Sequence, residues 1–257
     1  MIDAPADSAP APSLPPGPPA VAIVVAVLNE AENIAAVAAE IADAFAERPA
    51  FETVFVDDGS TDATAATIRA LAASDPRIRL VRHAERCGKS AALRTGIAAA
   101  RAPWIATMDG DGQNDPRDLV AMLRAAEAAG DPAPLVAGIR VRRHDPLPRR
   151  IATRIGNGIR RALLKDDCPD TACGMKVFRR DAFLALPCFE GMHRFLPALF
   201  RRAGAPLINH PVAHRPRAAG HSKYTNLGRA IAGIPDLFGV MWLRSRMRTP
   251  AIRNDDA

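Results

Sequence analysis

The chain has 257 residues, 48% of them hydrophobic, and a formal net charge of +6 at pH 7. This length and composition allow one large domain with a full core and exclude a wholly disordered chain. The excess of positive charge suggests an anionic partner, which is a nucleic acid, a phosphorylated substrate or a membrane surface.

Residues 1–20 are mostly Ala, Pro, Ser and Asp. They lack the basic start and the apolar run of a signal peptide, so we predict a disordered tail. No later stretch reaches the ~20 apolar residues of a membrane-spanning helix, and the chain is not expected to cross a membrane. The four cysteines show no Cys-x-x-Cys spacing, which favours reduced thiols in a cytosolic protein.

From Val21 onward, apolar runs alternate with segments of helical periodicity. The run Val21–Leu28 predicts a strand buried on both faces, and Asn29 is suited to cap the following helix. Further strands are predicted at Thr53–Val56, Ile78–Val81, Trp104–Met108 and Leu135–Arg140, with helices through Ile34–Phe45, Ile68–Leu71, Ser90–Ala100 and Leu119–Ala129. These alternations predict an α/β fold with a mostly parallel sheet and helices on both faces.

Three of the predicted strands end in polar or acidic residues. Asn29-Glu30 follows the first strand, Asp57-Asp58 follows the second, and Asp109-Gly110-Asp111 follows the fourth. Parallel sheets bind ligands beyond the carboxyl ends of their strands. The sequence therefore predicts a binding site at this edge of the sheet.

Asp109, Asp111 and Gln113 alternate with glycines directly after a buried strand. Carboxylate and amide oxygens suit Mg²⁺ or Mn²⁺, which typically bridges a few protein oxygens and a diphosphate. An Asp-Gly turn without a ligand is the alternative. The two neighbouring polar strand ends favour the metal site.

The segment Asp57–Ser60 also follows a buried strand. Ser60 or Thr61 is suited to cap the next helix, whereas a carboxylate before them can accept hydrogen bonds from a nucleobase or a ribose. Gly88-Lys89-Ser90 looks like the end of a P-loop, but His83 stands where that loop needs its first glycine. Lys89 at a helix N-terminus is still suited to hold a phosphate.

Basic residues dominate the chain between Arg140 and Lys165, where Asp145 is the only acid. Near the C-terminus, Leu227–Arg248 carries apolar residues near helical spacing and ends in several arginines. Such a segment either packs on the core or lies on an anionic membrane leaflet.

Eight motifs follow one another in a specific order between Val21 and Leu243. They are Ala26–Glu30, Asp57–Asp62, Gly88–Ala92, Met108–Pro116, Gly138–Arg140, Asp170–Arg179, Arg194–Pro197 and Arg217–Tyr224. In this order they resemble glycosyltransferase family 2, and within it the dolichyl-phosphate mannosyltransferase-like group of polyprenyl-phosphate sugar synthases. The chain has Ala26 and Leu28 where the family has Pro and Tyr, and Met175-Lys176 where Phe-Arg is usual.

The resemblance implies a GT-A fold with a Rossmann-like sheet in a single domain. Residues 21–226 would form the catalytic domain, with a nucleotide-binding half at about 21–140 and an acceptor-binding half at about 141–226. Residues 227–257 would form an amphipathic segment that associates with a membrane.

The resemblance also implies functional residues. The nucleotide-sugar ligands would be Ala26, Leu28, Glu30, Asp57, Asp58, Lys89, Asp109, Gly110 and Asp111. The phosphates of donor and acceptor would be bound by Arg140, Arg217, Ser222 and Lys223. Asp109, Asp111 and Gln113 would hold Mg²⁺ or Mn²⁺, and Asp111 and Asp170 are the catalytic candidates. Asp170 matches a proposed base of the family and is expected to act either as a base or as a positioning group.

The implied activity is that of an inverting glycosyltransferase that moves a sugar from GDP-mannose or a UDP-sugar to a polyprenyl phosphate of the dolichyl or undecaprenyl type. The expected location is the cytoplasm, peripheral on the cytoplasmic face of the inner membrane. A family 2 enzyme acting on another acceptor, in envelope polysaccharide or lipopolysaccharide synthesis, is the alternative. A nucleotidyltransferase would need an early Gly-rich loop that the chain lacks. A nucleic-acid-binding module would not explain the acidic strand ends, so no nucleic acid is expected as a partner.

Overall fold

The computed structural model describes residues 17–48, 50–141, 147–216 and 226–247. Within them, one sheet of seven strands has the order β3-β2-β1-β4-β6-β5-β7. Its strands are β1 (Val21–Val27), β2 (Phe51–Asp57), β3 (Ile78–Arg82), β4 (Trp104–Asp109), β5 (Leu135–Arg140), β6 (Lys176–Arg179) and β7 (Leu207–Val212). The helices are α1 (Ala31–Ala44), α2 (Thr64–Ser74), α3 (Lys89–Ala99), α4 (Pro116–Ala128), α5 (Leu147–Leu164), α6 (Arg180–Leu184), the 3-10 helix η1 (Met192–Arg194), α7 (Leu196–Arg202) and α8 (Asn226–Arg246).

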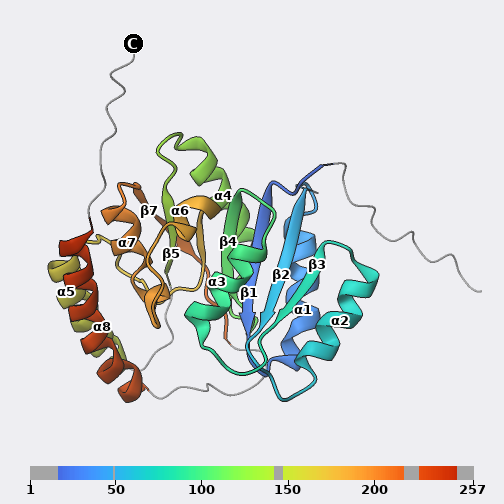
Figure 1. Cartoon of the computed structure of the whole chain (residues 1–257), viewed down its shortest axis with the longest axis horizontal. Helices are drawn as coiled ribbons and strands as arrows, with labels where there is room; N and C mark the ends of the chain where they lie inside the picture. Colours follow the sequence, from blue (N-terminus) through green and yellow to red (C-terminus); the bar gives the residue numbers. More distant parts are fainter. Residues whose placement is uncertain (1–16, 49, 142–146, 217–225, 248–257) are drawn as a thin grey trace, which may run out of the picture.

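The sheet is mostly parallel, as predicted. β6 pairs antiparallel with β4 and β5, whereas the other pairs of strands are parallel. Val27 of β1 lies opposite Asp57 of β2, and Ala26 lies opposite Asp109 of β4. The three polar strand ends therefore meet at one edge of the sheet, the lower edge in Figure 1.

The side chains of β1 alternate between two hydrophobic cores. Val21, Ile23 and Val25 pack with side chains of α1 and α4, whereas Ala22 and Val24 pack with side chains of α3 on the opposite face. Because both faces of the sheet are covered, the strand needs apolar residues at every position, which explains its continuous apolar run. Burial of each large side chain stabilises the fold by about 1.5–3 kcal/mol. The helices thus hold the carboxyl edge of the sheet from both sides.

The predicted capping roles of Asn29 and Ser60 are wrong. The residue at the cap position of α1 is Glu30, whose side chain makes no capping bond. Asn29 has a left-handed backbone conformation, with φ of 49°, which Asn tolerates better than most residues. Its Oδ1 accepts a hydrogen bond from the Thr61 amide, and its own amide donates to the Ser60 hydroxyl, both at 2.8 Å. These residues therefore join the ends of β1 and β2 and do not start helices.

The chain after Arg140 contains elements that the sequence pattern did not predict. These are α5, β6, α6, α7 and β7, and β6 lies between β4 and β5 in the sheet. Strands from both predicted halves thus share one sheet, which confirms a single α/β domain. α8 confirms the C-terminal helix and lies beside α5 (Figure 1). In the described part of the chain no helix is long and apolar enough to span a bilayer. Most of the predicted disordered tail, residues 1–20, lies outside the described residues.

Candidate functional site

Three segments converge on Asp109, the last residue of β4. The Asp109 amide donates to the Oδ1 of Asn114 at 3.1 Å, and the ammonium of Lys89, the first residue of α3, donates to Asp109 Oδ1. On another side lies Gly174, where a Cβ atom would come within 2.6–2.7 Å of the Asp109 carboxylate. Only glycine allows this approach, so the segment that leads into β6 shapes the space around Asp109.

Asp109 is ionised at neutral pH. Its burial raises the pKa of the carboxyl group, but the charge and hydrogen bond of Lys89, with the charges of Lys176 and Arg140, outweigh burial and hold the pKa of Asp109 below its usual range. The site therefore combines a charged carboxylate with several cations, which is the charge pattern required to bind both a metal ion and phosphate groups.

Asp111 and Gln113 follow Asp109 in the same loop. Asp111 Oδ1 accepts a hydrogen bond from the Gln113 amide at 3.3 Å, and Gln113 Nε2 donates to the carbonyl of Arg215 at 3.2 Å. Two carboxylates and an amide oxygen are a donor set that fits Mg²⁺ or Mn²⁺. The roles of Asp109, Asp111 and Gln113 as ligands of this ion stay predictions.

Arg140 and Asp170 form a bidentate ion pair beside this loop. Arg140 Nε donates to Asp170 Oδ2 at 2.7 Å, and Nη2 donates to Oδ1 at 2.8 Å. Burial lowers the pKa of Arg140, but the hydrogen bonds and charge of Asp170 more than offset this and raise it. Arg140, a predicted phosphate ligand, is thus paired with Asp170, the predicted base. In this geometry the Asp170 carboxylate is suited to orient the Arg140 guanidinium.

The carboxylates at the end of β2 are buried and accept several hydrogen bonds. Asp57 accepts from the Ser60 amide at 2.9 Å and from Arg82 Nε at 3.1 Å. Asp58 accepts from the amides of Cys87 and Gly88, both at 2.8 Å. These bonds fix the loop before α3, and the predicted contacts of Asp57 and Asp58 with a nucleotide stay predictions.

The remaining predicted nucleotide ligands lie at the end of β1. Ala26, Leu28 and Glu30 are half-buried there, and Glu30 Oε2 accepts a hydrogen bond from Asn33 Nδ2 at 2.7 Å. Gly110 fits closely against the same strand, because a Cβ atom at this position would come within 2.5 Å of Val27 Cγ1. The predicted phosphate ligands Arg217, Ser222 and Lys223 lie outside the described residues.

Two groups near Asp109 were not predicted from the sequence, the buried Lys176 and the half-buried His193. The ammonium of Lys176 donates to the carbonyls of Cys173 and Thr171, and burial lowers the pKa of Lys176. His193 is brought to the site by η1, and its Nδ1 lies 2.8 Å from Ser90 Oγ in the first turn of α3. Lys176 and Ser90 lie within recognised motifs, but nothing in the sequence pattern pairs Ser90 with a histidine 103 residues away.

The imidazole of His193 is held in its neutral form. The backbone amide of His193 donates to Ser90 Oγ at 3.3 Å, and the same hydroxyl lies at hydrogen-bond distance from Nδ1, so both the backbone and the ring of His193 are tied to the first turn of α3. Burial, followed by the charges of Lys89, Arg194 and Lys176, lowers the pKa of His193 well below its usual range. A neutral ring adds no further positive charge next to Lys89.

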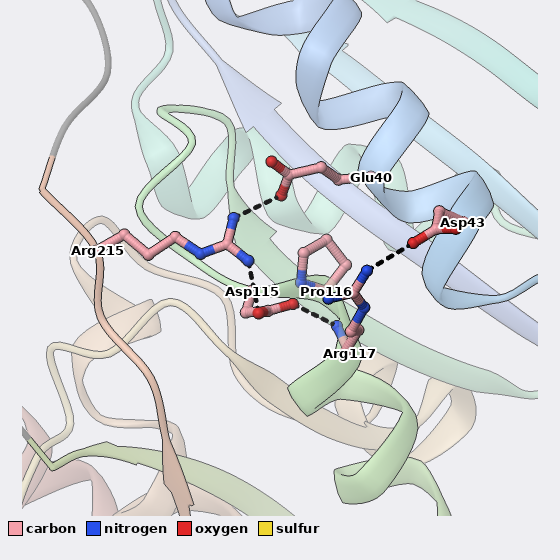
Figure 2. Close-up of a pocket in the computed structure, with 6 residues that line it drawn as sticks. All are labelled: Glu40, Asp43, Asp115, Pro116, Arg117 and Arg215. Atoms are coloured by element: carbon pink, nitrogen blue, oxygen red, sulfur yellow. Dashed lines mark hydrogen bonds and ion pairs between the residues drawn. The ribbon is translucent and has the colours of Figure 1, made fainter.

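A pocket of about 260 Å³ adjoins the loop that carries Asp109. Figure 2 shows Arg215 reaching across it from the segment after β7. Arg215 Nη1 lies 2.9 Å from Glu40 on α1, and Nη2 lies 2.5 Å from Asp115 at the start of α4. The Arg215 amide also donates to the Gln113 carbonyl at 2.9 Å. These charged groups are already paired with one another. The ion pairs that line the pocket therefore anchor the loop, and the pocket does not resemble a substrate site.

Comparison with protein families shows to which family the chain belongs. The family described as Glycosyl transferase family 2 matches residues 22–186, and the chain belongs to this family. It is 32% identical to the dodecaprenyl-phosphate galacturonate synthase of Rhizobium johnstonii, over 86% of the chain and 66% of that protein. It is 30% identical to the undecaprenyl-phosphate 4-deoxy-4-formamido-L-arabinose transferase of Edwardsiella ictaluri, over 79% of the chain and 62% of that protein. The chain thus spans about two thirds of the length of these relatives or slightly less.

A solved structure confirms the fold. Glucosyl-3-phosphoglycerate synthase from Mycobacterium tuberculosis, in complex with Mn²⁺, UDP and glucosyl-3-phosphoglycerate, superposes with a TM-score of 0.64. The match covers 90% of this chain and 81% of that chain at 22% sequence identity. The predicted GT-A fold is therefore confirmed, and the family match confirms the predicted class of enzyme, a glycosyltransferase.

The low pKa of His193 gives the fold a specific acid sensitivity. Unfolded His193 takes up a proton near pH 6.5 whereas the folded residue does not, so this residue costs no stability above that pH and destabilises the fold progressively below it. We expect the free energy of unfolding in urea to fall between pH 7 and pH 5, with a contribution from His193 of at most about 1.4 kcal/mol per pH unit. His193→Gln should flatten this dependence, whereas the control His210→Gln, on β7 and away from Ser90 and Lys89, should not. An unchanged pH dependence in His193→Gln would contradict the assignment.

Proposed function

We propose that this family 2 glycosyltransferase transfers a sugar from a nucleotide-sugar to a polyprenyl phosphate with inversion at the anomeric carbon. The observation that carries the proposal is the grouping of Asp109 with Lys89 and with the Arg140–Asp170 pair at the carboxyl edge of the sheet. The names of the two relatives support the class of acceptor, because they specify dodecaprenyl phosphate and undecaprenyl phosphate.

The donor half of the reaction needs groups that bind a diphosphate. Lys89 begins α3, where the ammonium and the N-terminal amides of the helix both favour a phosphate group. Asp109 and Asp111 would hold Mg²⁺ or Mn²⁺, and a bound ion of this kind offsets the negative charge that grows on the leaving diphosphate. Lys89 donates to Asp109, so the ammonium and the metal-binding carboxylate would both lie beside the diphosphate of the donor.

The acceptor half of the reaction needs a cationic group more than it needs a base. A phosphate monoester has its second pKa near 6, so at pH 7 it is largely a dianion. One of its oxygens attacks the anomeric carbon, and the nucleoside diphosphate leaves from the opposite face. Both oxygens of Asp170 accept hydrogen bonds from Arg140, so we assign Asp170 a positioning role. The oriented guanidinium then offers a fixed pair of donors to a phosphate.

We further propose that α5 and α8 form the membrane-facing surface. Ile159 and Leu163 on α5 are 53% and 42% exposed, and Ile234, Phe238 and Trp242 on α8 are 58–63% exposed. On each helix these residues are four positions apart, which places them on one face. Arg244 donates to the carbonyl at the end of α5, so the two helices are joined. Exposed apolar stripes flanked by arginines suit an anionic leaflet, and we place the enzyme on the cytoplasmic face of the inner membrane.

The proposed reaction is tested with undecaprenyl phosphate and a panel of labelled donors, including GDP-mannose, UDP-glucose, UDP-N-acetylglucosamine and UDP-galacturonic acid. We expect one donor to yield a labelled lipid in the organic phase, and EDTA to abolish the transfer, because charge on the leaving diphosphate is then uncompensated. Full transfer in EDTA would contradict the metal assignment. Transfer to 3-phosphoglycerate in place of the lipid would contradict the acceptor assignment.

The proposed membrane surface is tested by flotation with vesicles that contain phosphatidylglycerol. The double variant Phe238→Ser, Trp242→Ser should bind at least about tenfold more weakly, because burial of each aromatic side chain contributes about 1.5–3 kcal/mol. Val141→Ser is the matched control, because Val141 is 67% exposed and lies outside both helices. Equal flotation of the wild type and the double variant would refute the assignment of this surface.

A further inference from the structure

A second cluster of potential metal ligands lies apart from Asp109 and Asp111. Asp58 follows β2, His83 follows β3, and Cys87 lies in the loop before α3. One oxygen, one nitrogen and the sulfur of these three side chains lie within 4.8 Å of one another. Asp58 is buried, His83 is half-buried and Cys87 is exposed, so the cluster is anchored in the protein and open to solvent on the cysteine side.

Neighbouring groups already hold two of the three side chains in place. His83 Nε2 lies 3.0 Å from Thr95 Oγ1, a partner that can accept the ring proton and leave the Nδ1 lone pair directed at the cluster. Asp58 Oδ2 accepts a hydrogen bond from the Gly88 amide and Oδ1 accepts one from the Cys87 amide, both at 2.8 Å. Outer contacts of this kind orient metal ligands before the ion arrives and strengthen its binding.

The geometry between the ligand atoms suits exchange of a proton for a metal ion. His83 Nδ1 lies 2.8 Å from Asp58 Oδ1, so these two ligand atoms already face each other. A cation bound to Nδ1 leaves the ring proton on Nε2, facing Thr95 Oγ1, and coordination by the sulfur releases the thiol proton of Cys87 to solvent. The ion reaches the cluster from the exposed cysteine side.

We propose that Asp58, His83 and Cys87 bind a zinc-class cation. A mixed set of nitrogen, oxygen and sulfur ligands selects Zn²⁺ over Mg²⁺, whereas the all-oxygen set at Asp109 and Asp111 favours Mg²⁺ or Mn²⁺. Three protein ligands leave the fourth position of a tetrahedral ion for water. The chain thus offers two cation sites of different chemistry at the same edge of its sheet.

Occupation of this site opposes donor binding, a consequence that rests on the proposed function. Asp58 is among the predicted nucleotide ligands, and it fixes the amides of Cys87 and Gly88 immediately before Lys89. An ion bound to Asp58 occupies a carboxylate that is predicted to contact the nucleotide. It also changes the conformation of the loop that leads to Lys89. Zinc therefore acts as an inhibitor that competes with the nucleotide.

The test uses Cd²⁺ as the probe, because a Cd²⁺–thiolate bond produces an ultraviolet absorption band. The reduced, metal-free protein is titrated under nitrogen, and one equivalent of Cd²⁺ should generate the band. Cys87→Ser should abolish it, and His83→Gln should weaken Cd²⁺ binding by at least about tenfold. Cys188→Ser is the matched control, because Cys188 is the other exposed cysteine among the described residues, and it should behave as the wild type. An unchanged band in Cys87→Ser, or unchanged affinity in His83→Gln, would overturn the proposed site.

The inhibitory consequence is measured separately, as the binding of GDP and of UDP in the presence of Mg²⁺. One equivalent of Zn²⁺ should weaken nucleotide binding by the wild type but not by Cys87→Ser. Nucleotide binding that is equal with and without Zn²⁺ would overturn the inhibitory role. The existence of the metal site is decided by the Cd²⁺ titration alone. Failure of both nucleotides to bind in the absence of Zn²⁺ would instead count against the proposed function.

Discussion

The contact of Asp109 with Lys89 and Gly174 is the constraint on which the site depends. It places a charged carboxylate where β4 ends, α3 begins and the chain enters β6. The carboxylate would be costly to bury alone, and the cations around it keep it ionised. The same cations make the surrounding space suitable for phosphate groups. One arrangement therefore explains both the stability of a half-buried charge and the affinity that we propose for a sugar nucleotide.

The first half of the fold and its acidic edge could be predicted from sequence, because buried parallel strands need continuous apolar runs and their ends lie at one edge. The second half could not. β6 has four residues and runs antiparallel, and α5 has glycines and five arginines within its 18 residues. Contacts between distant residues were also beyond the sequence, as with Ser90 and His193. Asn29 failed as a predicted cap because its side chain bonds to the loop after β2.

Ion pairs hold the charged residues around Asp109 in place. Asp170 was expected to act as a base or a positioning group, and its bidentate contact with Arg140 favours positioning. Arg215, which the sequence did not single out, joins the loop of Asp109 to α1 and α4 through Asp115 and Glu40. The edge of the sheet that carries Asp109 is thus supported by ion pairs, while apolar side chains of α5 and α8 are exposed on the surface that we propose to face a membrane.

We propose above all that Asp109 holds the metal ion of a bound nucleotide, and this binding is measured by calorimetric titration with Mn²⁺ together with GDP or UDP. We predict that Asp109→Asn weakens binding of the Mn²⁺–nucleotide pair by at least about tenfold, because an amide is a weaker ligand than a carboxylate. Asp43→Asn should bind as the wild type does, because Asp43 is exposed and pairs with Arg117 away from Asp109. Equal affinities of Asp109→Asn and the wild type for both nucleotides would contradict the account.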